Sequence, residues 1–147
     1  MRVWLASKSA RRADMLAQIF PHLTCHGIDS VDESSTSSVV SGQVLEICQK
    51  KAAAVNLEND YELIVVSDTM IQDPDVDVQA MGKANDAIEA AAMLHRLAGR
   101  RHRVWTATGI WYNSKWEFHL NEAIVEVDAL SDDCLLYTSD AADDETS

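Results

Sequence analysis

The sequence predicts an α/β protein, because segments with helical periodicity alternate along the chain with short strand-like runs. The expected helices cover residues 10–20, 43–57 and 86–98. The expected strands cover residues 2–6, 23–28, 63–66, 103–112 and 116–127. No stretch approaches the roughly 20 apolar residues that a membrane-spanning helix needs, so no membrane partner is expected.

Local signals in the first half of the chain set the expected element ends. Residues 2–6 are mostly apolar and predict a buried strand. Ser9 is a plausible N-cap for the helix that follows, and Pro21 closes that segment. Residues 29–41 are polar and rich in serine, which favours a loop before the helix at 43–57.

Signals in the second half are similar in kind. The apolar, β-branched run 63–66 predicts a short strand, and residues 72–82 predict an acidic loop. Asn85 is the expected cap of the third helix, which Gly99 ends. Two alternating runs around Asn113–Ser114 predict a β-hairpin.

Composition limits the function classes. The chain of 147 residues fits one domain, expected at 1–130, and carries a net charge of −12. An acidic body argues against general nucleic-acid binding. The three cysteines are far apart and show no metal or disulfide spacing, so we expect a cytoplasmic protein. Residues 131–147 hold six acids and no base, and we expect a disordered or non-native tail there.

The stretch "LASKSARRADML" at residues 5–16 gathers hydroxyls and cations where the first helix begins. Unpaired N–H groups at a helix N-terminus, together with serine hydroxyls and arginines, form an anion site. Cations at this end of a helix interact unfavourably with the helix dipole, so the presence of the adjacent Arg11 and Arg12 here requires an explanation. The alternative is a solvated first turn capped by Ser9, and the stretch alone does not decide between them.

Lys51 interrupts an apolar stripe. In the helix expected at 43–57 this stripe consists of Val44, Ile47, Cys48 and Val55, and Lys51 falls at its centre. A lone buried ammonium is costly, so the side chain either extends to solvent or meets an anion.

Asp68 follows the apolar run 63–66, one residue beyond its end, within "VVSDTMI". The carboxyl end of a central strand is where α/β sheets place their ligands. If the first strand runs parallel to this one, Asp68 shares an edge with the stretch 7–12. Such a carboxylate binds a divalent cation or orients a water molecule, unless it is a turn residue bonded to nearby backbone.

These stretches together resemble the Maf family of nucleoside triphosphate pyrophosphatases, also described as septum formation inhibitor Maf-like proteins. The similar motifs appear in the family's order: "LASKSARRADML", "VDES", "KAAAV", "IVVSDTMI" and "GKANDAIEAAAMLHRLAGRRHRVWTATGI". The resemblance runs from Arg2 to about Asp128. It implies an α/β fold around a mixed, elongated β-sheet flanked by helices, like that of the inosine triphosphatases, which is incomplete at the C-terminus here.

The resemblance also implies a function: metal-assisted hydrolysis of a nucleoside triphosphate to the monophosphate and pyrophosphate, in nucleotide-pool sanitation. By motif, the substrate-binding residues would be Ser7, Arg11, Arg12, Glu33, Lys51 and Lys83. Asp68 would be the catalytic base, and Asp68 with Glu33 would hold Mg²⁺ or Mn²⁺. Thr69 after the acid resembles the branch that prefers dTTP and UTP. A homodimer is possible by resemblance.

Two other functions stay open. The chain could be a truncated homologue that binds nucleotides without turnover, or a regulator of septum formation that acts through a protein partner. One departure from the family pattern is Ala84, where proline is usual after Gly-Lys.

Overall fold

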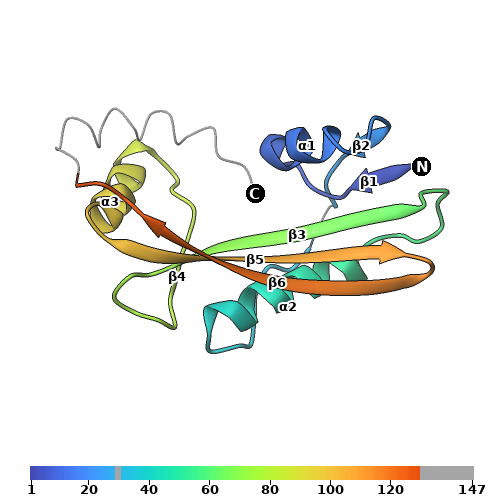
Figure 1. Ribbon diagram of the computed structural model, residues 1–147. Helices are drawn as coiled ribbons and strands as arrows, with labels where there is room; N and C mark the ends of the chain where they lie inside the picture. Colours follow the sequence, from blue (N-terminus) through green and yellow to red (C-terminus); the bar gives the residue numbers. More distant parts are fainter. Residues whose placement is uncertain (29–30, 130–147) are drawn as a thin grey trace.

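A mixed β-sheet with the strand order β2-β1-β3-β5-β6 organises the fold (Figure 1). The computed structural model describes residues 1–28 and 31–129, and in these residues the sheet has six strands. The strands are β1 (Val3–Leu5), β2 (Leu23–Cys25), β3 (Leu63–Gln72), β4 (Ala80–Met81), β5 (Arg101–Tyr112) and β6 (Lys115–Glu126). The helices are α1 (Ala10–Ala17), α2 (Val40–Ala53) and α3 (Ala87–Leu97). The tail expected at 131–147 lies outside the described residues.

The sheet joins a parallel part to an antiparallel part, which confirms the α/β prediction and the mixed sheet. β1 pairs in parallel with both β2 and β3, whereas β5 pairs antiparallel with β3 and β6. β3, β5 and β6 are the long strands, and α2 lies along one face of them while α1 lies on the other side, near β1 and β2 (Figure 1). The molecule is therefore elongated along these three strands.

β3 is longer than predicted. The expected strand ended at residue 66, but β3 continues to Gln72 because β5 pairs with it as far as Ile71. This pairing satisfies the backbone groups that β3 presents to β5 beyond residue 66, so the strand does not need apolar side chains there. The prediction that Asp68 lies just past the end of its strand is wrong.

Helix starts agree in part with the predictions. Ser9 caps α1, since its side chain accepts a hydrogen bond from the Arg12 N–H. The cap of α3 is Asp86 and not Asn85, because the Asp86 carboxylate accepts from the Glu89 N–H at 2.8 Å. Glu89 in turn accepts from the Asn85 N–H at 2.8 Å, so two acids three residues apart satisfy N–H groups at the helix start.

Other elements also differ from the predictions, among them β2, which ends at Cys25 and not at residue 28. α2 begins at Val40 and ends at Ala53, so part of the expected loop is helical and the expected last turn is not. β4 lies inside the segment predicted as an acidic loop, paired with the end of β3. α1 ends at Ala17, short of the expected residue 20.

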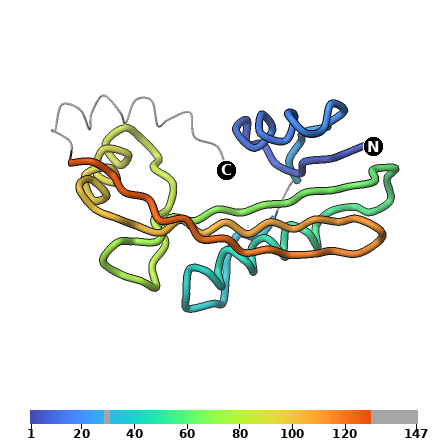
Figure 2. The backbone as a smooth tube through the Cα atoms, in the orientation of Figure 1, coloured from blue at the N-terminus to red at the C-terminus, as the bar shows by residue number. Residues whose placement is uncertain are grey.

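The predicted hairpin is confirmed. β5 and β6 pair along their whole length, and the chain turns at Asn113 and Ser114, whose φ angles are 51° and 64° (Figure 2). Positive φ at both central residues matches the right-handed twist of the flanking strands. In the part of the chain that the structure describes, no helix is long and apolar enough to cross a bilayer.

The core lies between α2 and the sheet. Val44, Ile47 and Cys48 of α2 are at most 1% exposed, as the apolar stripe predicted. The main buried cluster consists of Trp4, Ala6, Val44, Cys48, Ala52, Val55, Ile64, Val66 and Ala107. Burial of this stripe fixes the rotation of α2 about its axis and so decides where Lys51 points.

Candidate functional site

The short strand β1 leaves an open edge on β3. β1 pairs with β3 only from Leu63 to Val65, and the Ala6 N–H then donates to the Val65 carbonyl at 2.9 Å. The next carbonyl of β3 on this edge, that of Ser67, accepts from Arg12 Nη1 at 3.4 Å and from Lys51 Nζ at 3.1 Å. Cations from α1 and α2 therefore meet at one backbone oxygen.

The two cations reach this edge from opposite faces of the sheet. Successive strand residues point to opposite faces, and Lys51 contacts the Asp68 side chain while Arg12 contacts that of Thr69. The site is thus built across the edge of the sheet, at the point where β1 ends. A longer first strand would occupy this space.

Arg12 is held in place by three acceptors. Its Nη2 donates to Thr69 Oγ1 at 3.0 Å, and its Nη1 donates to Ser7 Oγ and to the Ser67 carbonyl, each at 3.4 Å. Burial lowers the pKa of Arg12, and the nearby Asp68 carboxylate opposes this effect. The guanidinium is therefore fixed before any ligand binds.

Ser7 helps to hold the Arg12 side chain in place, because its hydroxyl oxygen accepts from Arg12 Nη1. Its hydroxyl oxygen also accepts from the Ser9 N–H at 3.1 Å, and the residue is buried. Ser7 thereby links the start of α1 to the Arg12 side chain. The role of Ser7 in direct phosphate contact stays a prediction.

Lys51 meets two carboxylates. Its Nζ lies 3.2 Å from Asp68 Oδ1 and 3.6 Å from Glu33 Oε1. The side chains of Lys51 and Asp68 are 12% and 9% exposed, whereas that of Glu33 is 62% exposed. Of the two possibilities left open for Lys51, the structure shows the contact with an anion.

Asp68 has one oxygen in use and one without a partner. Oδ1 accepts from Lys51 Nζ, while Oδ2 is buried and has no hydrogen-bond partner among the described residues. Burial raises the pKa of Asp68; Lys51 opposes the rise, and Glu33 adds to it. A buried carboxylate oxygen with free lone pairs is a ready acceptor for a water molecule or a cation.

A cleft of about 610 Å³ opens beside Arg12. Its cationic residues are Arg11, Arg12 and Lys83, and Thr69 and Asn85 also line it. The larger apolar residues of its lining are Met15, Ile71, Met81, Met93, Leu94 and Leu97. A cavity of this size lined by both cationic and apolar side chains is typical of a site for a small organic anion.

The structure brings the predicted residues together in two groups. Ser7, Arg11, Arg12 and Lys83 lie at or behind the cleft, and Glu33, Lys51 and Asp68 meet across the sheet edge. The Ser67 carbonyl connects the groups, because it accepts from both Arg12 and Lys51.

Sequence reasoning missed three contributors to this site. The first is the Ser67 carbonyl, which the sequence does not mark because every residue has a backbone carbonyl. The second is Thr69, which the sequence marks only through its likeness to a family branch. Neighbouring residues of a strand point to opposite faces, so the Thr69 side chain lies on the face of the sheet opposite to Asp68. Thr106 supports Thr69 from β5, with 3.3 Å between the two hydroxyl oxygens, and only the strand register reveals it.

The donor set is compatible with a divalent cation that a substrate helps to bind. No group of three or more histidine, cysteine or acidic side chains forms a metal site in residues 1–28 and 31–129. Glu33 and Asp68 nevertheless converge on Lys51, and Asp68 Oδ2 is unpartnered. Mg²⁺ commonly uses one or two carboxylates and completes its coordination with water and phosphate oxygens.

Comparison with known proteins assigns the chain to a family. The family described as Maf-like protein matches residues 2–143. The chain belongs to the Maf family. The chain is 31% identical over 131 residues to a dTTP/UTP pyrophosphatase of Pyrococcus abyssi, with 89% of this chain and 67% of the relative covered. It is 34% identical over 113 residues to a dTTP/UTP pyrophosphatase of Caldanaerobacter subterraneus, with 75% of this chain and 52% of the relative covered.

Solved structures share the fold of this Maf-family chain. The Staphylococcus aureus Ham1 protein superimposes with a TM-score of 0.53 at 15% identity, over 85% of this chain and 70% of that one. A HAM1 protein from Coxiella burnetii gives a TM-score of 0.52 at 12% identity, over 86% of this chain and 72% of that one. The Maf-family chain therefore spans between about half and two thirds of the two sequence relatives above, and somewhat more of these structures.

Proposed function

We propose that this Maf-family chain hydrolyses nucleoside triphosphates to the monophosphate and pyrophosphate, with dTTP and UTP as the preferred substrates. The relatives named above are dTTP/UTP pyrophosphatases. The observation that carries the proposal is Asp68, a buried carboxylate with one unpartnered oxygen, beside cations from two helices. Hydrolysis of a polyphosphate needs this combination of a base and positive charge.

The cleft binds the phosphates in this proposal. A triphosphate is a polyanion, and Arg11, Arg12 and Lys83 supply positive charge on the cleft wall. Arg12 is already fixed by Ser7, Thr69 and the Ser67 carbonyl, so little conformational entropy is lost when it binds phosphate. The apolar residues of the lining offer a surface to the rest of the nucleotide.

Asp68 acts as the general base. A water molecule bonded to Oδ2 attacks the α-phosphorus and gives its proton to Asp68; the new P–O bond forms as the bond from the α-phosphorus to the α–β bridging oxygen breaks, and pyrophosphate leaves. A raised pKa makes Asp68 a stronger base than an exposed aspartate. Lys51, which contacts Oδ1, holds the carboxylate in orientation.

Glu33 and Asp68 are the residues that would hold Mg²⁺ or Mn²⁺. The ion would neutralise charge on the phosphates when bound. The Lys51 ammonium group contacts both carboxylates and offsets the repulsion between their negative charges when no metal ion is bound.

Three wider statements belong to the same proposal. The nucleotide-binding body covers residues 1–130, the protein works in the cytoplasm on the nucleotide pool, and it binds neither nucleic acid nor membrane. A homodimer and a septum-regulating protein partner stay hypotheses.

The direct test is pyrophosphate release from dTTP and UTP with Mg²⁺ or Mn²⁺. We expect release by the unaltered chain, and a loss of at least about 100-fold in Asp68→Asn, the usual minimum for removal of a general base. Asp77→Asn, which changes an exposed acid outside the site, is the control and keeps the activity. Tight triphosphate binding without release would favour the non-hydrolysing alternative, and equal rates in both variants would refute the role of Asp68.

A further inference from the structure

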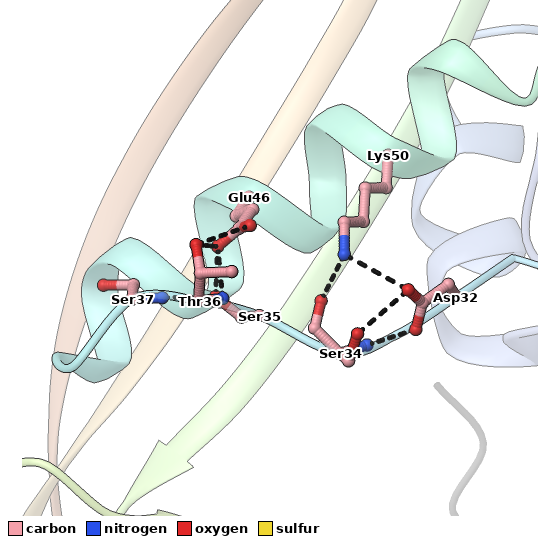
Figure 3. A network of polar contacts seen from close by, with 7 residues as sticks. All are labelled: Asp32, Ser34, Ser35, Thr36, Ser37, Glu46 and Lys50. Atoms are coloured by element: carbon pink, nitrogen blue, oxygen red, sulfur yellow. Dashed lines mark hydrogen bonds and ion pairs between the residues drawn. The ribbon is translucent and has the colours of Figure 1, made fainter.

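The loop that carries Glu33 is tied to α2 by two side chains of that helix. Residues 32–37 run alongside α2, and Glu46 and Lys50, one helical turn apart, face them (Figure 3). The sequence gives a reason to expect this, because residues four apart lie on one side of a helix. The same helix carries Lys51, which points to Asp68.

Lys50 holds the residues on either side of Glu33. Its Nζ donates to the Ser34 carbonyl at 2.7 Å and to Asp32 Oδ2 at 3.4 Å. Asp32 in turn accepts from the Ser34 N–H and from the Ser34 hydroxyl, each at 2.9 Å. Asp32 and Ser34 therefore close a turn that is fixed at both ends to one lysine (Figure 3). Glu33 is the residue between these two ends in the sequence.

Glu46 holds the next part of the loop. Its carboxylate accepts from the Thr36 N–H at 3.0 Å, from the Thr36 hydroxyl at 3.1 Å and from the Ser35 hydroxyl. These hydrogen bonds, with that of Ser35 first, lower the pKa of Glu46, so the group stays charged near neutral pH. The loop is thus held at two successive points along the helix.

Glu33 cannot be held by its own burial. Its side chain is 62% exposed, and Oε1 lies 3.6 Å from Lys51 Nζ, a distance typical of a weak ion pair. On an untethered loop, ordering the Glu33 carboxylate beside Lys51 and Asp68 would cost conformational entropy. The position of its backbone must therefore come from neighbouring contacts.

We propose that Glu46 and Lys50 are positioning residues that hold segment 32–36 against α2, so that the Glu33 carboxylate stays beside Lys51 and Asp68. The consequence for cation or phosphate binding rests on the proposed function, whereas the tethering does not. Neither residue touches the reacting atoms; both act through Glu33.

The first test measures the tether without turnover. Hydrogen exchange of the amides of residues 34–37 is compared in the unaltered chain, Glu46→Ala, Glu46→Gln and Glu58→Gln. We expect exchange to speed up about tenfold or more in Glu46→Ala, to recover partly in Glu46→Gln, which keeps one acceptor oxygen, and to stay unchanged in β3. Glu58→Gln, an exposed change after α2, is the control. Unchanged exchange in Glu46→Ala would overturn the proposal.

The second test asks whether the tether acts through Glu33. Binding of Mn²⁺ alone is measured by electron paramagnetic resonance. Supporting contacts around metal ligands are typically worth 10–100-fold in affinity, so Glu46→Ala and Lys50→Ala should weaken binding by about tenfold. In a Glu33→Gln background Glu46→Ala should have no further effect; an equal loss there would indicate a general structural role and overturn the proposal.

The outcomes separate the two proposals. A chain that binds Mn²⁺ as described but releases no pyrophosphate disproves the hydrolase function and leaves the positioning role supported. A chain that releases pyrophosphate at the same rate in Glu46→Ala, with unchanged exchange, keeps the function and loses the positioning role.

Discussion

Asp68 lies in surroundings that, on balance, oppose its negative charge. Burial and the Glu33 carboxylate raise its pKa, while Lys51 and Arg12 lower it. Burial is the largest of these effects, so the folded pKa lies above the ordinary value of 3.8. The Asp68 carboxyl group therefore loses its proton at a higher pH than the carboxyl group of an exposed aspartate does.

The pH profile of the reaction follows from this balance. The base must be ionised to accept a proton, so kcat/KM should fall as the pH drops through the folded pKa of Asp68. Glu33→Gln removes a negative neighbour and lowers that pKa, so the acid limb of the profile should move to lower pH. The substrate's own ionisation is common to both proteins, which makes the difference between the two profiles the measurement. A limb that moves to higher pH would contradict the assignment of Asp68 as the base.

At the scale of elements, the close contact of three strands depends on Gly109 in β5. A Cβ built there would lie 2.7 Å from Phe118 Cε1 of β6 and 2.8 Å from Val66 Cγ2 of β3. Val66 is fully buried in the core and Phe118 packs against the core, so a Cβ at this position would have to displace packed side chains. Glycine at this position lets side chains from both neighbouring strands cover the backbone of β5.

Gly109→Ala should therefore destabilise the protein. Overpacking of a filled core costs typically about 1–3 kcal/mol, and we expect a loss of this size in the free energy of unfolding, measured in urea. Gly82→Ala is the matched control, because nothing lies within 4 Å of a Cβ built there. Equal stability of the two variants would show that Phe118 and Val66 adjust at no cost.

A second element-scale contact joins the acidic segment after β3 to α3. Asp73 is 3% exposed and accepts from Arg96 Nε at 2.8 Å and Nη2 at 2.9 Å. It also accepts from the N–H groups of Asp75 and Val76. The hydrogen bonds from Arg96 are the largest cause that lowers the pKa of Asp73, to about 2.

This contact predicts a pH dependence of stability. A carboxylate whose pKa is lowered by folding stabilises the fold at pH values above its unfolded pKa of 3.8, and this stabilisation is lost as the pH falls from there toward about 2. Asp73→Asn should be less stable at pH 7 and should lose less stability over that range. Urea unfolding at pH 7 and pH 3 measures both effects, and Asp77→Asn serves as the exposed control. Parallel losses in Asp73→Asn and the unaltered chain would contradict the prediction.

Periodicity predicted that these elements exist, but it did not locate all their ends. The stripe of Val44, Ile47 and Cys48 was sufficient to find α2 and the face that it buries. The length of β3 depends on pairing with β5, a contact between residues about forty positions apart that a local pattern does not contain. β4 was not predicted for the same reason, because its two residues form a strand only by pairing with β3.

At the scale of the whole molecule, the fold gathers cations into one region of an acidic protein. The net charge is −12, yet Arg12, Lys51 and Lys83 come from three distant parts of the sequence to the region around β3. Residue types and family motifs predicted which side chains take part. The convergence of two cations on the Ser67 carbonyl was not predictable, since it depends on where β1 ends.

A polyphosphate that bridges these cations should stabilise the entire fold. The cleft is lined by α1, β3, the segment around Lys83 and α3, so an anion bound there links parts of the chain that are far apart in sequence. Binding to the folded state alone stabilises it by about 2.7 kcal/mol when the ligand is at 100 times its Kd. We therefore expect inorganic tripolyphosphate with Mg²⁺ to raise the Tm by several degrees, less so at high salt, where exposed charges are screened.

Single substitutions separate this linkage from a general salt effect. Lys83→Ala should lose a large part of the Tm increase, because Lys83 brings the segment before α3 to the phosphates. Lys115→Ala removes an exposed lysine at the β5–β6 turn, outside the cleft, and should keep the full increase. If both variants respond alike, the anion binds elsewhere on the molecule. If only Lys83→Ala loses the response, the cleft holds the polyphosphate.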